Sequence, residues 1–141
     1  MATIELNETQ LQDLLQLVYL GEWVTQAYGN SENAADLEEL EQKIYSVAYN
    51  NGIESDVAFD KKMGGYLPTP EFEEFCDEII EKYDDNNFWE ELIVRLANKE
   101  LKANGGDSMS PSEMEKNLNE LIKKYELEFH KNGIDNLVVT K

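Results

Sequence analysis

Apolar side chains recur at helical spacing in five segments of this sequence, and this regularity constrains the fold more than any other feature. Side chains three and four positions apart share one face of an α-helix, so each segment can bury one face and expose the other. The apolar spacing and the flanking start and stop residues predict helices over 9–28, 34–50, 70–83, 88–103 and 111–131. The sequence therefore predicts a mainly α fold of about five helices.

Residues that begin helices stand at the expected places. Asn7 and Ser110 each precede a Gln or Glu by three positions, as in a capping box, and Thr69 precedes a proline. The four polar residues 84–87 interrupt the apolar pattern and offer an N-cap for the helix that follows. We therefore expect the third helix to end there and a separate fourth helix to begin.

Two further regions favour β structure. The stretch 53–67 has no clean period and contains two consecutive glycines, which predicts a long loop with a short hairpin around 57–66. Residues 3–6 and 136–140 are β-prone, and they could pair as a two-stranded ribbon that joins the termini. Such a ribbon has marginal stability by itself.

The length of 141 residues is typical of one domain, so we expect a single acidic helical domain over residues 1–141. The uncharged stretch 14–21 is only eight residues, and no uncharged stretch exceeds the ten residues of 44–53, which is too short to cross a membrane. The N-terminus lacks the pattern of a secretory signal, and the lone Cys76 cannot form an internal disulfide. These features predict a cytoplasmic protein.

The net charge of −18 is unevenly distributed. Residues 1–91 hold 22 acids and four lysines, whereas residues 92–141 hold eight acids and eight bases. A surface of this sign repels polyanions, which argues against nucleic acid or an anionic membrane as a direct partner. We expect the partner to be a protein with a basic surface.

The third predicted helix is the most acidic segment. Four glutamates at three-and-four spacing form one stripe, flanked by two more acids, and the like-charge pairs cost about 1–2.5 kcal/mol in total at low salt. One interpretation is a solvated face that keeps the protein soluble, and the other is an acidic binding surface. On the second interpretation, the expected partner-binding residues are Glu38, Glu41, Glu71, Glu74, Asp77, Glu78 and Glu81.

In size and charge the chain resembles the small acidic helical DNA mimics of phages and plasmids, including anti-restriction proteins. The resemblance covers composition and no motif, so it argues by analogy. It implies an alternative function, in which the carboxylates imitate a phosphate ladder and inhibit a nucleic-acid-binding enzyme. The neutral C-terminal third would confine such mimicry to one face.

Residues with catalytic or metal-binding potential all have simpler structural roles. The run 84–87 lacks the glycine and alternating spacing of a calcium loop, and His130 has only Glu126 at ligand spacing on its helix. Cys76 follows Phe75 on an apolar stripe, which predicts a buried and inert thiol. We therefore expect no catalytic residue, cofactor or metal, with a small metal-dependent enzyme as the remaining alternative. A homodimer stays open because the first helix is apolar almost all round.

Overall fold

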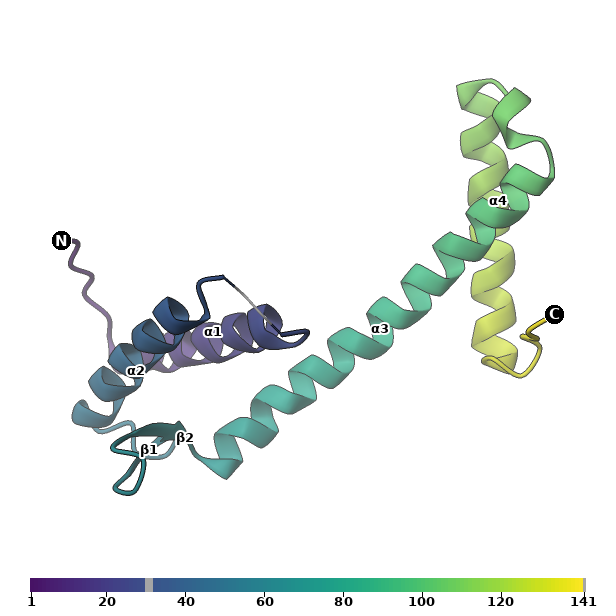
Figure 1. Ribbon diagram of the computed structural model, residues 1–141. Helices are drawn as coiled ribbons and strands as arrows, with labels where there is room; N and C mark the ends of the chain where they lie inside the picture. The colour runs from purple at the N-terminus through teal and green to yellow at the C-terminus, as the bar shows by residue number, and fades with distance from the viewer. Residues whose placement is uncertain (30–31, 141) are drawn as a thin grey trace. The chain divides into compact units, whose positions relative to one another are not determined.

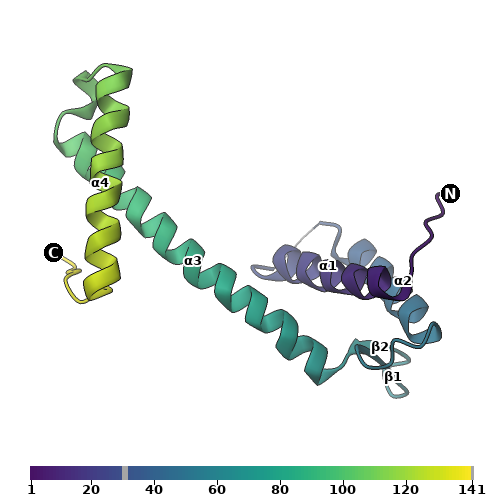
Figure 2. The same ribbon diagram turned by 180° about the vertical axis from the view of Figure 1, so that it is seen from behind.

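A computed structural model describes residues 1–29 and 32–140, and the chain forms two compact units, Met1–Glu81 and Lys82–Lys141 (Figures 1 and 2). The elements in chain order are α1 (Glu8–Gln26), α2 (Ala34–Asn50), β1 (Val57–Asp60), β2 (Gly65–Pro68), α3 (Pro70–Ala103), the 3₁₀ helix η1 (Gly106–Ser108) and α4 (Pro111–Asn132). The boundary between the units falls within α3. A single cooperative unfolding transition of both units would support the expectation of a single domain.

The prediction of a mainly helical fold is confirmed, but the described residues form four α-helices rather than about five. The expected break at residues 84–87 is wrong, because α3 continues through them. Asp and Asn in a helix interior cost at most about 0.7 kcal/mol each relative to Ala, far less than proline. Without a glycine or proline there, four weak helix formers do not end the helix.

The capping boxes expected at the starts of α1 and α4 are confirmed, whereas α1 ends at Gln26, two residues before the predicted end. The Asn7 side chain accepts a hydrogen bond from the Gln10 backbone N–H at 2.9 Å, and the Gln10 side chain accepts one from Asn7 N–H at 3.0 Å. Ser110 and Glu113 form the same reciprocal box at the start of α4. The bounds of α2 match the prediction, since the spacing of apolar residues is a local property that the sequence carries directly.

Unit 1, Met1–Glu81, has a continuous apolar core. Its helices α1 and α2 pack together, and β1, the loop before it and the start of α3 complete the cluster. The buried members are Leu11, Leu15, Tyr45, Ala48, Ile53, Val57, Phe72 and Cys76. Full burial of a large apolar side chain contributes about 1.5–3 kcal/mol, so this cluster is the main source of stability in unit 1.

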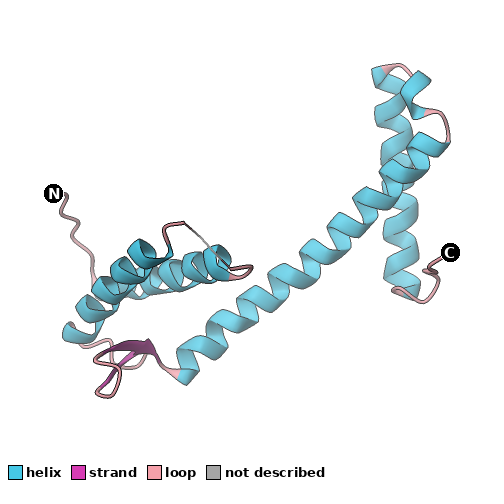
Figure 3. Ribbon diagram, viewed as in Figure 1, coloured by secondary structure: helices cyan, strands magenta, loops and turns pink. Residues whose placement is uncertain are grey.

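The only strands among the described residues form an antiparallel hairpin, drawn in magenta in Figure 3. Val57 pairs with Pro68 and Asp60 with Gly65, which confirms the hairpin expected in this stretch. The ribbon expected between the termini is absent from the described residues, where 1–6 and 137–140 have no regular structure. A four-residue connection closes with far less loss of entropy than a loop of most of the chain.

Unit 2, Lys82–Lys141, is a helical hairpin of the second part of α3 and α4. Its buried apolar side chains are Ala97, Leu101 and Phe129. The helices turn tightly at Gly106, where a Cβ would lie 2.8 Å from the Leu101 carbonyl oxygen, so only glycine fits. Among the described helices, none is long and apolar enough to cross a membrane.

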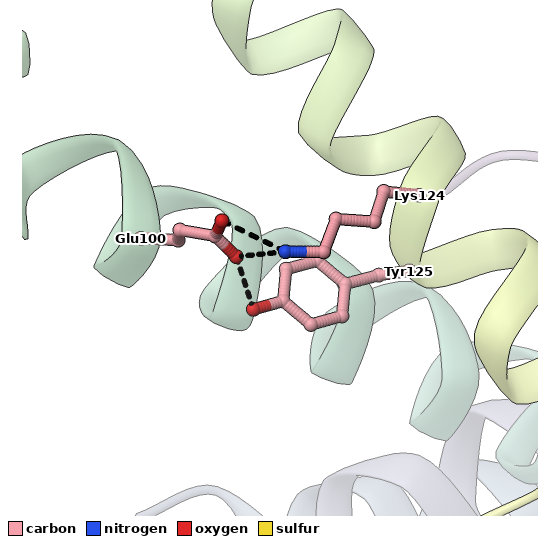
Figure 4. A network of polar contacts seen from close by, with 3 residues as sticks. All are labelled: Glu100, Lys124 and Tyr125. Carbon is pink, nitrogen blue, oxygen red and sulfur yellow. Dashed lines mark hydrogen bonds and ion pairs between the residues drawn. The ribbon is translucent and has the colours of Figure 1, made fainter. Parts of the chain in front are cut away.

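A polar network also ties the two helices of unit 2 together (Figure 4). Both carboxylate oxygens of Glu100 lie 2.8 Å from Lys124 Nζ, and the Tyr125 hydroxyl donates a hydrogen bond of 2.6 Å to Glu100 Oε2. The Lys124 ammonium lies 5.2 Å from the centre of the Tyr125 ring. Hydrogen bonds from Lys124 and Tyr125 lower the pKa of Glu100, and the hydrogen bond to Glu100, together with burial, raises the pKa of Tyr125 to about 12.

Candidate functional site

The start of α3 is anchored to the loop before β1, and this anchor fixes the position of the acidic residues that follow. Thr69 N–H donates to the Asp56 carbonyl at 2.9 Å, and the Thr69 hydroxyl donates to the Ser55 carbonyl at 2.7 Å. The same hydroxyl accepts a bond from Phe72 N–H at 3.3 Å, which confirms Thr69 as the N-cap.

Two buried side chains set which face of α3 looks outward in unit 1. Phe72 and Cys76, four positions apart, are 7% and 0% exposed, and the Phe72 ring meets Tyr19 edge-on with centroids 5.8 Å apart. Because residues three and four apart share a face, this pair leaves the intervening acids on the solvent side. The acidic stripe, defined as Glu71, Glu74, Glu78 and Glu81, is exposed along its whole length.

The exposed acids of α3 border an open groove of about 470 Å³, here called the acidic groove. It is lined by Pro70, Glu73, Glu74, Asp77, Glu78 and Glu81. Among the described residues, none of these carboxylates forms an ion pair with a lysine or arginine. The groove therefore presents five carboxylates without a cationic partner among the described residues.

The charges of acidic residues on α3 also contribute to pKa shifts of buried side chains in unit 1. Burial, together with Asp77 and Glu73, raises the pKa of the Tyr19 hydroxyl to about 12. Burial and the nearby Asp77 and Asp56 raise the pKa of the Cys76 thiol to about 11. The structure confirms the expectation of a buried thiol, and a raised pKa disfavours the thiolate that would be the nucleophile.

Glu71 lies at a second and larger groove that the sequence did not reveal. This mixed groove, about 660 Å³, is lined by Gln12, Asp13, Gln16, Glu54, Ser55, Asp56, Thr69, Glu71, Phe72 and Phe75. Phe75 was expected on the inner face, but 52% of it is exposed at this groove. The core accommodates Phe72 and Cys76, whereas Phe75, three positions after Phe72, lies on a part of the helix surface that faces solvent.

The expected partner-binding residues on α2 lie outside both grooves. Glu38 is exposed, whereas Glu41 is half-buried, and burial raises the pKa of its carboxyl group, with Glu22 and Glu38 adding to the shift. The buried Tyr45 hydroxyl lies near Glu41 but has no hydrogen-bond partner of good geometry, so it does not donate a well-aligned hydrogen bond to the Glu41 carboxylate. The structure thus gathers Glu74, Asp77, Glu78 and Glu81 at one groove, and it places Glu38 and Glu41 elsewhere.

Residues considered for metal binding are not grouped in the part of the chain that the structure describes. No set of three or more His, Cys, Asp or Glu side chains there has the arrangement of a metal site. Residues 84–87 lie inside α3, where consecutive side chains point about 100° apart around the axis. His130 lies in the last turn of α4, where a positive charge interacts favourably with the helix dipole.

Comparison with protein-family models, with curated proteins and with solved structures found no match to this chain.

Proposed function

We propose that this chain is a non-enzymatic binding module that engages a basic protein surface through the exposed acids of α3 in unit 1. The observation that carries the proposal is the acidic groove, where five carboxylates line about 470 Å³ without a basic partner among the described residues. Closely spaced like charges cost stability, and a cationic partner would recover that cost on binding.

The uneven charge supports a local surface rather than a general solubility device. Unit 1 carries 18 acids and three bases, whereas unit 2 carries 12 acids and nine bases. A chain that needed charge only for solubility would gain as much from acids spread over both units. We place the function in the cytoplasm, in keeping with a single cysteine that is free and buried.

The test is affinity capture from the native lysate with the full chain immobilised. The stripe-neutral variant E74Q/E78Q/E81Q removes three charges from the acidic groove. The control variant E115Q/E120Q/E126Q removes three charges from α4, where these side chains form no hydrogen bond or ion pair with described residues. Both variants have the same net charge, so they separate a local surface from the overall charge.

We expect the wild type and the control variant to retain the same basic proteins at about 50 mM salt and to release them at about 300 mM. The stripe-neutral variant should retain far less. Equal capture by the two variants would contradict the proposal. Displacement of the captured protein by duplex DNA would identify the narrower function, a decoy for a nucleic-acid-binding enzyme, and no displacement would identify an ordinary adaptor.

A further inference from the structure

Unit 2 contains a surface that complements the acidic stripe. An open groove of about 470 Å³, here called the basic groove, is lined by Val94, Arg95, Asn98, Lys99 and Lys102 on the second part of α3. Three of these five residues are cationic and none is acidic. Another groove, on α4, mixes Glu115 and Glu120 with Lys116 and Lys123, so the single sign of the basic groove is not general to unit 2.

The cations of the basic groove are available for a new partner. Among the described residues, Lys99 and Lys102 form no ion pair, and Arg95 pairs only with Glu91 one turn earlier, at 3.0 Å. The Arg95 side chain is 79% exposed, and exposed pairs of this kind exchange readily with another carboxylate. Val94, which is 43% exposed, adds an apolar contact in the same groove.

The spacing of the two charged sets specifies how they fit. Along the chain, Glu71, Glu74 and Glu78 are separated by three and then four residues. Arg95, Lys99 and Lys102 are separated by four and then three. Read in opposite directions the two series coincide, so an antiparallel alignment of helices places Glu71 opposite Lys102 and Glu78 opposite Arg95. Glu74 then faces Lys99, whereas a parallel alignment leaves the middle pair one residue out of register.

We propose that the partner of the acidic stripe is a second copy of this chain, which docks its basic groove there with the two α3 segments antiparallel. Each copy carries both surfaces, so identical chains can make the contact. The alignment also brings the acidic first turn of one α3 to the basic last turn of the other, where opposite helix dipole ends meet. This proposal rests on the function proposed above and names its partner.

We expect the affinity of this contact to be low. The paired parts of the two surfaces, 71–78 and 95–102, each extend about 10 Å along the helix axis at the rise of an α-helix, and the charged pairs remain close to solvent. Two chains of net charge −18 also repel each other at long range. At about 0.1 M salt the Debye length is about 10 Å, which screens that repulsion more than it screens charges in contact.

The experiment is sedimentation equilibrium of the full chain at about 0.1 M salt, with reversed charges on each surface. E71K/E74K/E78K makes both surfaces basic, and R95E/K99E/K102E makes both acidic. Their net charges become −12 and −24, so a mixed pair has the same total charge as two wild-type chains. E115K/E120K/E126K, also at −12, is the matched control on α4.

We expect self-association of the wild type and the control, a Kd at least about tenfold weaker in each charge-reversed variant alone, and association restored in their equimolar mixture. A mixture that stays monomeric, or reversed variants that associate like the wild type, would overturn the proposal. If the mixture stays monomeric while the stripe still captures basic proteins, only the second copy as partner is wrong. If capture also becomes independent of the stripe, the proposed function is wrong as well.

Discussion

The two units use charge in opposite ways. Unit 1 has a net charge of −15 and a core of eight buried apolar residues, and its acidic stripe has no basic partner among the described residues. Unit 2 has a net charge of −3 and few buried apolar side chains, and it uses Glu100, Lys124 and Tyr125 to join its helices. A sufficient apolar core lets unit 1 leave its charges outside, where a partner can use them.

The largest expected effect tests the core of unit 1. Leu15 is completely buried, so Leu15→Ala should lower the free energy of unfolding by about 2–5 kcal/mol through lost burial and the cavity left behind. Leu127 in unit 2 is 72% exposed, and the same substitution there should cost less than about 0.5 kcal/mol. Urea titration measures both, and equal losses would refute the assignment of stability to this core.

Two tyrosines offer a sharper comparison, because they should respond with opposite sign. Tyr125→Phe removes the hydroxyl that donates to Glu100, and we expect a loss of about 1 kcal/mol in the free energy of unfolding. Tyr45→Phe removes a buried hydroxyl without a hydrogen-bond partner of good geometry, and we expect a gain of up to about 1 kcal/mol. Destabilisation by both substitutions would show that the polar group in unit 1 is also structural.

The pH dependence of Tyr125 tests the network of unit 2 without relying on unfolding. Its pKa is raised to about 12, chiefly by the hydrogen bond to Glu100, so the associated stability is present below about pH 10 and lost as pH rises towards 12. In Glu100→Gln the pKa should fall towards that of a free tyrosine. Ultraviolet titration follows the phenolate, with Tyr125→Phe identifying its signal, and an unchanged pKa would rule out Glu100 as the cause.

The smallest effects concern repulsion within the acidic stripe. Glu74→Gln and Glu78→Gln each remove like-charge neighbours, and we expect each to raise the free energy of unfolding by about 0.2–0.5 kcal/mol at low salt. The gain should disappear at about 1 M salt, where the Debye length is about 3 Å. Glu126→Gln in unit 2 is the control. A gain that persists at high salt would point to helix propensity instead of charge.

The sequence predicted what depends on near neighbours along the chain. The caps at Asn7, Thr69 and Ser110 and the short hairpin are of this kind, and so is the acidic stripe on one face of its helix. The continuation of α3 through residues 84–87 was not predicted, because the sequence offers a cap there and the balance between capping and continuing is small.

The grooves required the folded structure. The mixed groove combines side chains of α1, the loop before β1 and α3, so no local pattern reveals it. The exposure of Phe75 follows from the same packing, since the core selects Phe72 and Cys76 over a third apolar residue on the same helix. The complementary charge of the acidic stripe and the basic groove can nevertheless be read from the sequence of α3, where acids at 71, 74 and 78 have the reverse spacing of bases at 95, 99 and 102.

The most direct test of the central claim, that the acidic stripe is a local binding surface, is its affinity for a defined lysine-rich helical peptide. Fluorescence anisotropy at about 0.1 M salt compares the wild type with the stripe-neutral variant E74Q/E78Q/E81Q and the control variant E115Q/E120Q/E126Q, which have equal net charge. We predict that Kd rises at least about tenfold in the stripe-neutral variant and less than about twofold in the control. Equal weakening in both variants would contradict the account, because net charge alone would then govern binding.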